Sequence, residues 1–203
     1  SIIESLSPEE LSLVDSITQK TLNTPLGNYD NMKPLLLAVF IGVTHHQEYL
    51  KDSGNYKGEP IDVFFDNDAT ERKMDVFSLE TPQQSFEYSM DSISFLTQIE
   101  YLIDNCKYND KMYVIAGNMY ESYKSNNVQS LLKATDDYTQ LVTDITDEYI
   151  TVKRNKLWMP KILEELKKGN AFIAVGSLHL VYSYGLVSLL RKEGFTLTPQ
   201  KIK

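Results

Sequence analysis

Residues 154–199 constrain the fold more than any other part of the chain. Residues 154–168 form an amphipathic pattern in which apolar side chains recur at i, i+3, i+4 and i+7, which predicts a helix. The continuous apolar segment 171–175 has the composition of a strand buried on both faces of a parallel sheet. A second helix over 185–193 and a short strand over 195–198 then complete a right-handed βαβ unit.

A second predicted strand, residues 74–79, lies in the middle of the chain and is followed by Glu80 and a proline. Residues 83–149 have a helical period and no strong strand signal. The expected fold class is therefore α/β, with a mixed, partly parallel sheet flanked by helices and a long helical middle section. We find no linker or repeat that would divide the chain, so we expect one domain over residues 1–203.

Composition excludes several classes of protein. The net charge is -8 and the basic residues are not clustered, which argues against nucleic-acid binding. The longest apolar run, residues 35–43, is too short to span a bilayer, so we expect no transmembrane segment in this chain. The single cysteine, Cys106, excludes an internal disulfide.

Two polar residues each follow a predicted strand, Glu80 after 74–79 and His179 after 171–175. If both strands are parallel in one sheet, both side chains emerge at its carboxyl edge, where they can share a divalent metal or act as an acid/base pair. The alternatives are that Glu80 caps the next helix and that His179 is a hydrogen-bonded residue of a strand–helix turn. Arg154 and the next residue can face solvent, but a cation at a helix start faces an unfavourable dipole, which indicates an acidic partner.

These residues resemble the TraB/GumN family, whose relatives include the Tiki metalloproteases. The C-terminal signature of that family is matched by Arg154-Asn155, Met159, Gly176-Ser177-Leu178-His179-Leu180, Gly185-Leu186 and Gly194-Phe195-Thr196. Leu79-Glu80-Thr81 resembles the family's internal Leu-Glu-Thr element.

The resemblance implies a metal-dependent, protease-like hydrolase with an α/β fold. It implies that His179 and Glu80 bind a divalent metal, Zn, Mn or Co, and that Arg154 positions a substrate carboxylate or an anionic transition state. A peptide or small-molecule substrate and an exported or membrane-associated protein are also implied, although no residue here identifies the compartment.

This sequence departs from the family pattern in two places. The family's first Gly-x-x-His is absent, because Gly42-Val43-Thr44-His45 has the spacing but lies within an apolar helix. Val181-Tyr182-Ser183-Tyr184 stands where the family has Pro-Gly. One histidine and one glutamate fall short of the three protein ligands usual for catalytic zinc. We therefore expect either an N-terminal segment that precedes Ser1 and carries Gly-Thr-x-His, or a degenerate member of the family.

Three functions stay open from the sequence: a metal-dependent hydrolase, a non-catalytic binding protein on the same scaffold, and a helical interaction module. The absence of a parallel sheet would favour the third. The substrate and the oligomeric state are not determined by these residues.

Overall fold

The structure is a computed structural model that describes residues 1–54, 59–143, 145 and 147–200. The chain forms two compact units, and each is described by itself. Unit 1 contains Ser1–Gly58 and Ile93–Ile145, and unit 2 contains Glu59–Ser92 and Thr146–Lys203.

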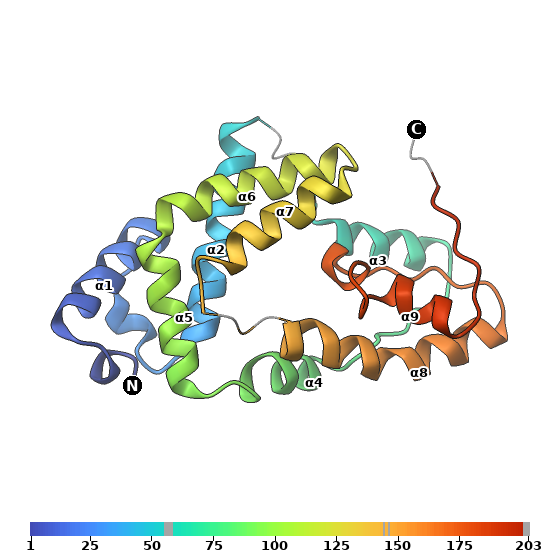
Figure 1. Cartoon of the computed structure of the whole chain (residues 1–203), viewed down its shortest axis with the longest axis horizontal. Coiled ribbons are helices and arrows are strands. Elements are labelled where there is room, and N and C mark those ends of the chain that lie inside the picture. The colour runs from blue at the N-terminus through green and yellow to red at the C-terminus, as the bar shows by residue number, and fades with distance from the viewer. Residues whose placement is uncertain (55–58, 144, 146, 201–203) are drawn as a thin grey trace. The chain divides into compact units, whose positions relative to one another are not determined.

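Unit 1 is a helical bundle. Its elements are η1 (Ile3–Ser5), α1 (Pro8–Leu22), η2 (Leu26–Tyr29), α2 (Pro34–Asp52), α5 (Phe95–Lys107), α6 (Asn109–Lys124) and α7 (Val128–Thr139). Helix α2 packs against α1, α5 and α6, and α6 lies beside α7 (Figure 1). The side chains that α2 and its neighbours bury most completely are Val14, Leu35, Leu37, Ile41 and Leu102. These apolar residues come from three helices, and α2 supplies three of the five, so α2 is the centre of the unit, as its sequence predicts.

Local sequence signals fix where α1 begins. The Ser7 hydroxyl accepts a hydrogen bond from the Glu10 amide at 3.3 Å, and the Glu10 carboxylate accepts one from the Ser7 amide at 2.8 Å. This reciprocal pair satisfies two amides that the first helical turn leaves without partners. The capping box expected from Ser7, Pro8 and Glu10 is confirmed. Among the described helices, none combines the length and the apolar character needed to span a bilayer.

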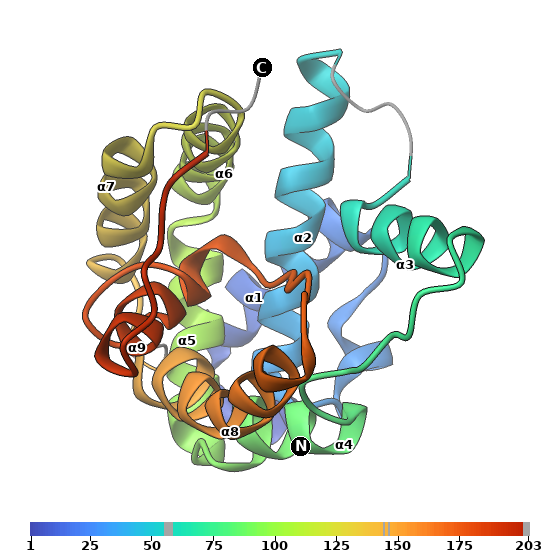
Figure 2. The same cartoon turned by 90° about the vertical axis from the view of Figure 1, so that its right-hand side faces the viewer.

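Unit 2 is also built from helices. Its elements are α3 (Ile61–Glu71), α4 (Pro82–Phe86), the π-helices η3 (Glu87–Asp91) and η4 (Asp147–Val152), α8 (Lys153–Lys168), η5 (Ser177–His179) and α9 (Leu186–Lys192). Helix α8 packs against η4 and α9 (Figure 2). The small core of this unit is formed by Trp158, Met159, Ile162 and Leu186. The apolar face predicted for residues 154–168 is therefore the face that α8 buries.

The expected α/β fold is wrong. No residue that the structure describes forms a strand, so the mixed sheet and the βαβ unit are both absent from this part of the chain. The segments 74–79, 171–175 and 195–198 have no regular secondary structure.

The predicted strands are absent because an apolar segment indicates that side chains are buried, but not which element buries them. Leu79, Ile173 and Val175 pack against the core formed by α8 and α9. In residues 74–79 only Leu79 packs in this way, and Phe77 is 57% exposed. On the other side of residues 171–175, Phe172 is 68% exposed. Alternation of this kind indicates that one side is buried, and helices can bury that side as well as a sheet can.

Candidate functional site

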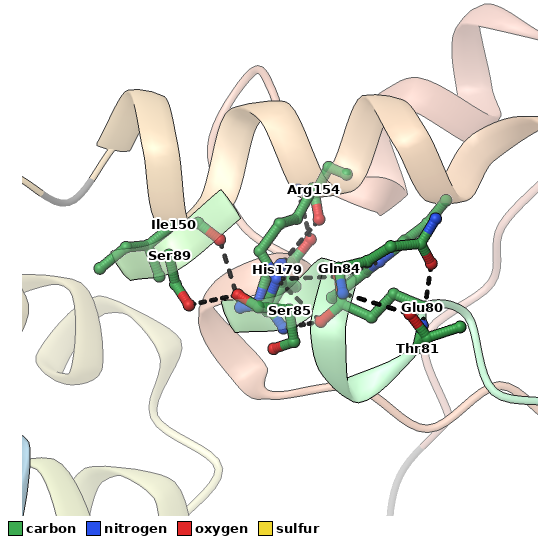
Figure 3. Close-up of polar contacts among 10 residues, drawn as sticks. Glu80, Thr81, Gln84, Ser85, Ser89, Ile150, Arg154 and His179 are labelled. Carbon is green, nitrogen blue, oxygen red and sulfur yellow. Dashed lines mark hydrogen bonds and ion pairs between the residues drawn. The ribbon is translucent and has the colours of Figure 1, made fainter. Parts of the chain in front are cut away.

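Glu80 is held by two residues of α8 (Figure 3). Arg154 Nη2 donates to Glu80 Oε1 at 2.6 Å, and Arg154 Nε lies 3.2 Å from both carboxylate oxygens. Trp158 Nε1 donates to Glu80 Oε2 at 2.9 Å. The side chains of Arg154 and Glu80 are only 18% and 13% exposed. Both carboxylate oxygens are thus occupied by donors that stand one helical turn apart on α8.

The segment before α4 is arranged so that Glu80 can face α8. Thr81, not Glu80, is the N-cap of α4: its hydroxyl accepts from the Gln84 amide at 3.2 Å, and Gln84 Oε1 accepts from the Thr81 amide at 2.9 Å. The prediction that Glu80 caps this helix is wrong. Lys161 Nζ donates to the Ser78 carbonyl oxygen, which ties the extended segment to α8 two residues before Glu80.

His179 is oriented by Asn155, whose side chain is completely buried. The Asn155 Nδ2 group donates to the carbonyl oxygens of His179 at 3.2 Å and Tyr184 at 3.0 Å. These two bonds fix the amide, so its Oδ1, which lies 2.7 Å from His179 Nδ1, is an acceptor. Nδ1 therefore carries the proton, and the neutral imidazole presents the lone pair of Nε2.

Trp158 connects the two halves of the site. Its ring lies 4.4 Å from the His179 ring between centroids, and Arg154 Cζ lies 4.9 Å from the Trp158 ring centroid. The same indole donates to Glu80. The structure thus brings Glu80, Arg154 and His179 into one network, with the indole between the carboxylate and the imidazole.

Burial and neighbouring charges set the protonation of the network. Burial by itself would raise the pKa of the Glu80 carboxyl, but the hydrogen bonds led by those from Arg154 and Trp158 outweigh it, and the pKa lies below the usual value. Burial and, to a smaller extent, the positive charge of Arg154 lower the pKa of His179, Glu80 offsets only part of this effect, and the resulting pKa is about 4. Near neutral pH the network thus contains an ionised carboxylate and a neutral imidazole.

We expect the His179 imidazole to stay in the neutral Nδ1–H form until the pH falls to about 4. Because the folded pKa lies below the unfolded value of 6.5, His179 contributes stability that is present above pH 6.5 and is lost as the pH falls through about 4. Imidazole ¹⁵N NMR checks the tautomer, and urea unfolding of the wild type beside His179→Gln checks the pH dependence. Titration of His179 near pH 6.5 would contradict this expectation.

The loop after His179 depends on one glycine. A Cβ atom at Gly185 would lie 2.0 Å from the Val181 carbonyl oxygen, so only glycine fits where this loop returns to α9. The loop supplies the Tyr184 carbonyl that Asn155 binds. Gly176 has no such requirement, because its φ of -56° is open to any residue.

Two members of the network were not recognised from the sequence. Asn155 was interpreted as a residue that can face solvent, and no role in the site was predicted for Trp158. For Trp158 the available signal was its spacing from Arg154, because the two residues stand at i and i+4 on one face of a helix. The acidic partner indicated for Arg154 is Glu80.

The residues of this site do not fit a metal ion. In the part of the chain that the structure describes, no three His, Cys, Asp or Glu side chains are grouped so that they could hold one. The Glu80 carboxylate is already paired with a guanidinium. Of the two predicted ligands, only His179 Nε2 therefore keeps a lone pair that could bind a metal ion. Catalytic zinc ordinarily has three protein ligands.

Comparison with known proteins supplies the family. No curated protein and no solved structure matches the chain significantly. The model of the TraB/PrgY/gumN family matches residues 1–199, which agrees with the resemblance carried by the motifs at Glu80 and His179. Because the match covers nearly the whole sequence, the chain belongs to the TraB/PrgY/gumN family.

Proposed function

We propose that this chain is a non-catalytic binding protein whose ligand is an extended polypeptide segment. The observation that carries the proposal is the pair of extended segments in unit 2, residues 74–79 and 171–175. Leu79 of the first segment and Ile173 and Val175 of the second pack on the helices, and both segments leave large apolar side chains exposed.

The backbone of residues 171–175 makes no backbone hydrogen bond to another described residue. Extended backbone with free N–H and C=O groups is a template for an incoming strand, whose own backbone supplies the matching groups. The exposed residues beside it provide apolar contacts: Val76 and Phe77 are 57% exposed and Phe172 is 68% exposed. Phe172 is positioned by an edge-on contact with Phe65 of α3, in which the two ring centroids lie 5.0 Å apart.

The polar network supports binding over catalysis. In it, the Glu80 carboxylate is neutralised by Arg154 and the His179 imidazole is fixed by Asn155. A base or nucleophile must reach its reacting atom, whereas these contacts hold the segments against α8. The lack of any strand among the described residues also favours an interaction module.

Selection from displayed random peptides of about ten residues tests this function. Such peptides are long enough to form a strand of ordinary length. We expect enriched peptides to alternate apolar and polar residues, and calorimetry to show that Phe172→Asp weakens the best of them by about tenfold or more. Leu96→Asp is the matched control, because Leu96 in unit 1 is 69% exposed and lies outside the proposed surface. Enriched peptides that bind Phe172→Asp as tightly as the wild type would refute the proposal, and so would the absence of any enrichment.

A metal-dependent hydrolase is the second candidate. It is favoured by the lone pair on Nε2 of a neutral His179, three residues after Gly176, in a chain of this family. It requires Zn, Mn or Co, and the described residues do not provide a complete ligand set for such an ion. Peptide cleavage that needs one of these metals and disappears in His179→Ala would favour this candidate over the binding protein.

A further inference from the structure

Unit 1 contains a cavity that plays no part in the proposed function. It lies among α1, α2 and α6 and has a volume of about 210 Å³. Since a water molecule occupies about 30 Å³ in the liquid, this volume suits a small molecule rather than a polymer. The lining residues are Lys20, Thr21, His45, Glu48, Asn109, Asp110 and Tyr113.

One buried atom in the cavity wall lacks a partner. His45 is 4% exposed, and its Nε2 lies 2.8 Å from Asn109 Oδ1. An amide oxygen only accepts, so Nε2 carries a proton, and a ring with that one proton has a lone pair on Nδ1. Nδ1 is buried and has no hydrogen-bond partner among the described residues. Such orphaned side-chain atoms are rare in folded proteins and indicate that a group is missing from the site.

The neighbour of this atom defines the missing group. His45 Nδ1 lies 3.6 Å from Glu48 Oε2, beyond hydrogen-bond distance, and both residues line the cavity. A lone pair and a carboxylate oxygen are both acceptors, so each requires a donor. A group with two or more N–H bonds and a positive charge satisfies both acceptors together.

The charges around the cavity select a cation. Lys20 and Asp110 lie 3.3 Å apart and offset one another, which leaves the Glu48 carboxylate as the uncompensated charge of the lining. Tyr113 adds an aromatic ring, and its hydroxyl donates to Asp52 at 2.7 Å, which fixes the ring position. Cations are attracted to such rings.

We infer that this cavity binds a small organic cation with a primary ammonium group. The ammonium donates one hydrogen bond to His45 Nδ1 and another to the Glu48 carboxylate, and its short apolar tail lies beside Tyr113. An anion would face the uncompensated carboxylate of Glu48. A metal ion would lack a third protein ligand of the usual kinds among the described residues.

The test uses NMR titration of the full-length chain with n-butylammonium, followed at the imidazole of His45. For a ligand this small we expect a Kd on the order of 1 mM. The matched probe is n-butyltrimethylammonium, which has the same charge and no N–H donor, and it is expected to leave the His45 signals unchanged.

Glu48→Gln tests the carboxylate, and Glu100→Gln, an exposed residue of α5 outside the cavity lining, is its control for the change in net charge. We expect Glu48→Gln to weaken butylammonium binding by about tenfold or more, and Glu100→Gln to leave it unchanged. Equal binding of the two probes, equal binding by Glu48→Gln and the wild type, or the absence of any shift at His45 would each overturn the inference.

Discussion

Replacing Arg154 by alanine is expected to lower the free energy of unfolding of unit 2 by about 3–5 kcal/mol. The reason is the carboxylate that remains. The Glu80 side chain is only 13% exposed, and without the guanidinium its negative charge keeps only uncharged donors, the Trp158 indole and the Ser85 hydroxyl. A charge removed from water without its partner costs far more than the loss of an exposed ion pair.

Urea unfolding followed by tryptophan fluorescence measures this effect in the correct unit, because Trp158 is the one tryptophan of the chain. Arg72→Ala is the matched control: Arg72 pairs with Asp68 in the same unit, but its side chain is 67% exposed. We expect that control to change the free energy of unfolding by less than about 1 kcal/mol.

A double variant separates the unpaired charge from lost packing. Arg154→Met combined with Glu80→Leu removes both charges together and is expected to recover most of the stability that Arg154→Ala loses. If Arg154→Ala were no more destabilising than Arg72→Ala, the close Arg154–Glu80 pair would be absent in solution.

Replacing Asn155 by alanine is expected to cost about 3 kcal/mol of stability, because three polar groups lose the hydrogen bonds that Asn155 makes to them. These groups are the carbonyl oxygens of His179 and Tyr184 and the Nδ1–H of His179. Asn155 is completely buried, so water does not replace the lost bonds without rearrangement of the loop.

The same change should release the imidazole of His179. We expect ¹⁵N NMR of Asn155→Ala to show a mixture of the two neutral tautomers, whereas the wild type shows the Nδ1–H form. Asn170→Ala, at an exposed position beyond the end of α8, is the control and should alter neither the tautomer nor the stability. A single Nδ1–H tautomer in Asn155→Ala would show that another group orients the ring.

Local patterns in the sequence predict much of the helical structure. The capping box at Ser7 and Glu10 marks the start of α1, and the amphipathic repeat predicts α8 almost to the residue. Both signals act within one or two helical turns, so no knowledge of distant residues is needed. Whether a sheet forms could not be predicted in this way, because a strand exists only if another segment pairs with it. Residues 171–175 have the apolar content of a strand, but their inward side chains meet helices.

The candidate site was predicted in part, for a similar reason. Glu80, Arg154 and His179 were singled out from family motifs and helix polarity, and they meet in one network. Their roles depend on side-chain geometry across 24 and 74 residues of sequence, which no local pattern encodes. Asn155 is the clearest example, because an asparagine near a helix start is ordinarily exposed and here it is buried.

Calorimetric titration of the full chain with Zn²⁺, beside Glu80→Gln and His179→Ala, tests most directly whether Glu80 and His179 are held by other side chains or by a metal. Because Arg154 and Trp158 occupy the carboxylate, we expect no one-to-one site with a Kd below about 1 μM. One equivalent of tightly bound Zn²⁺ that disappears in both variants would contradict this arrangement and favour the metal-dependent hydrolase.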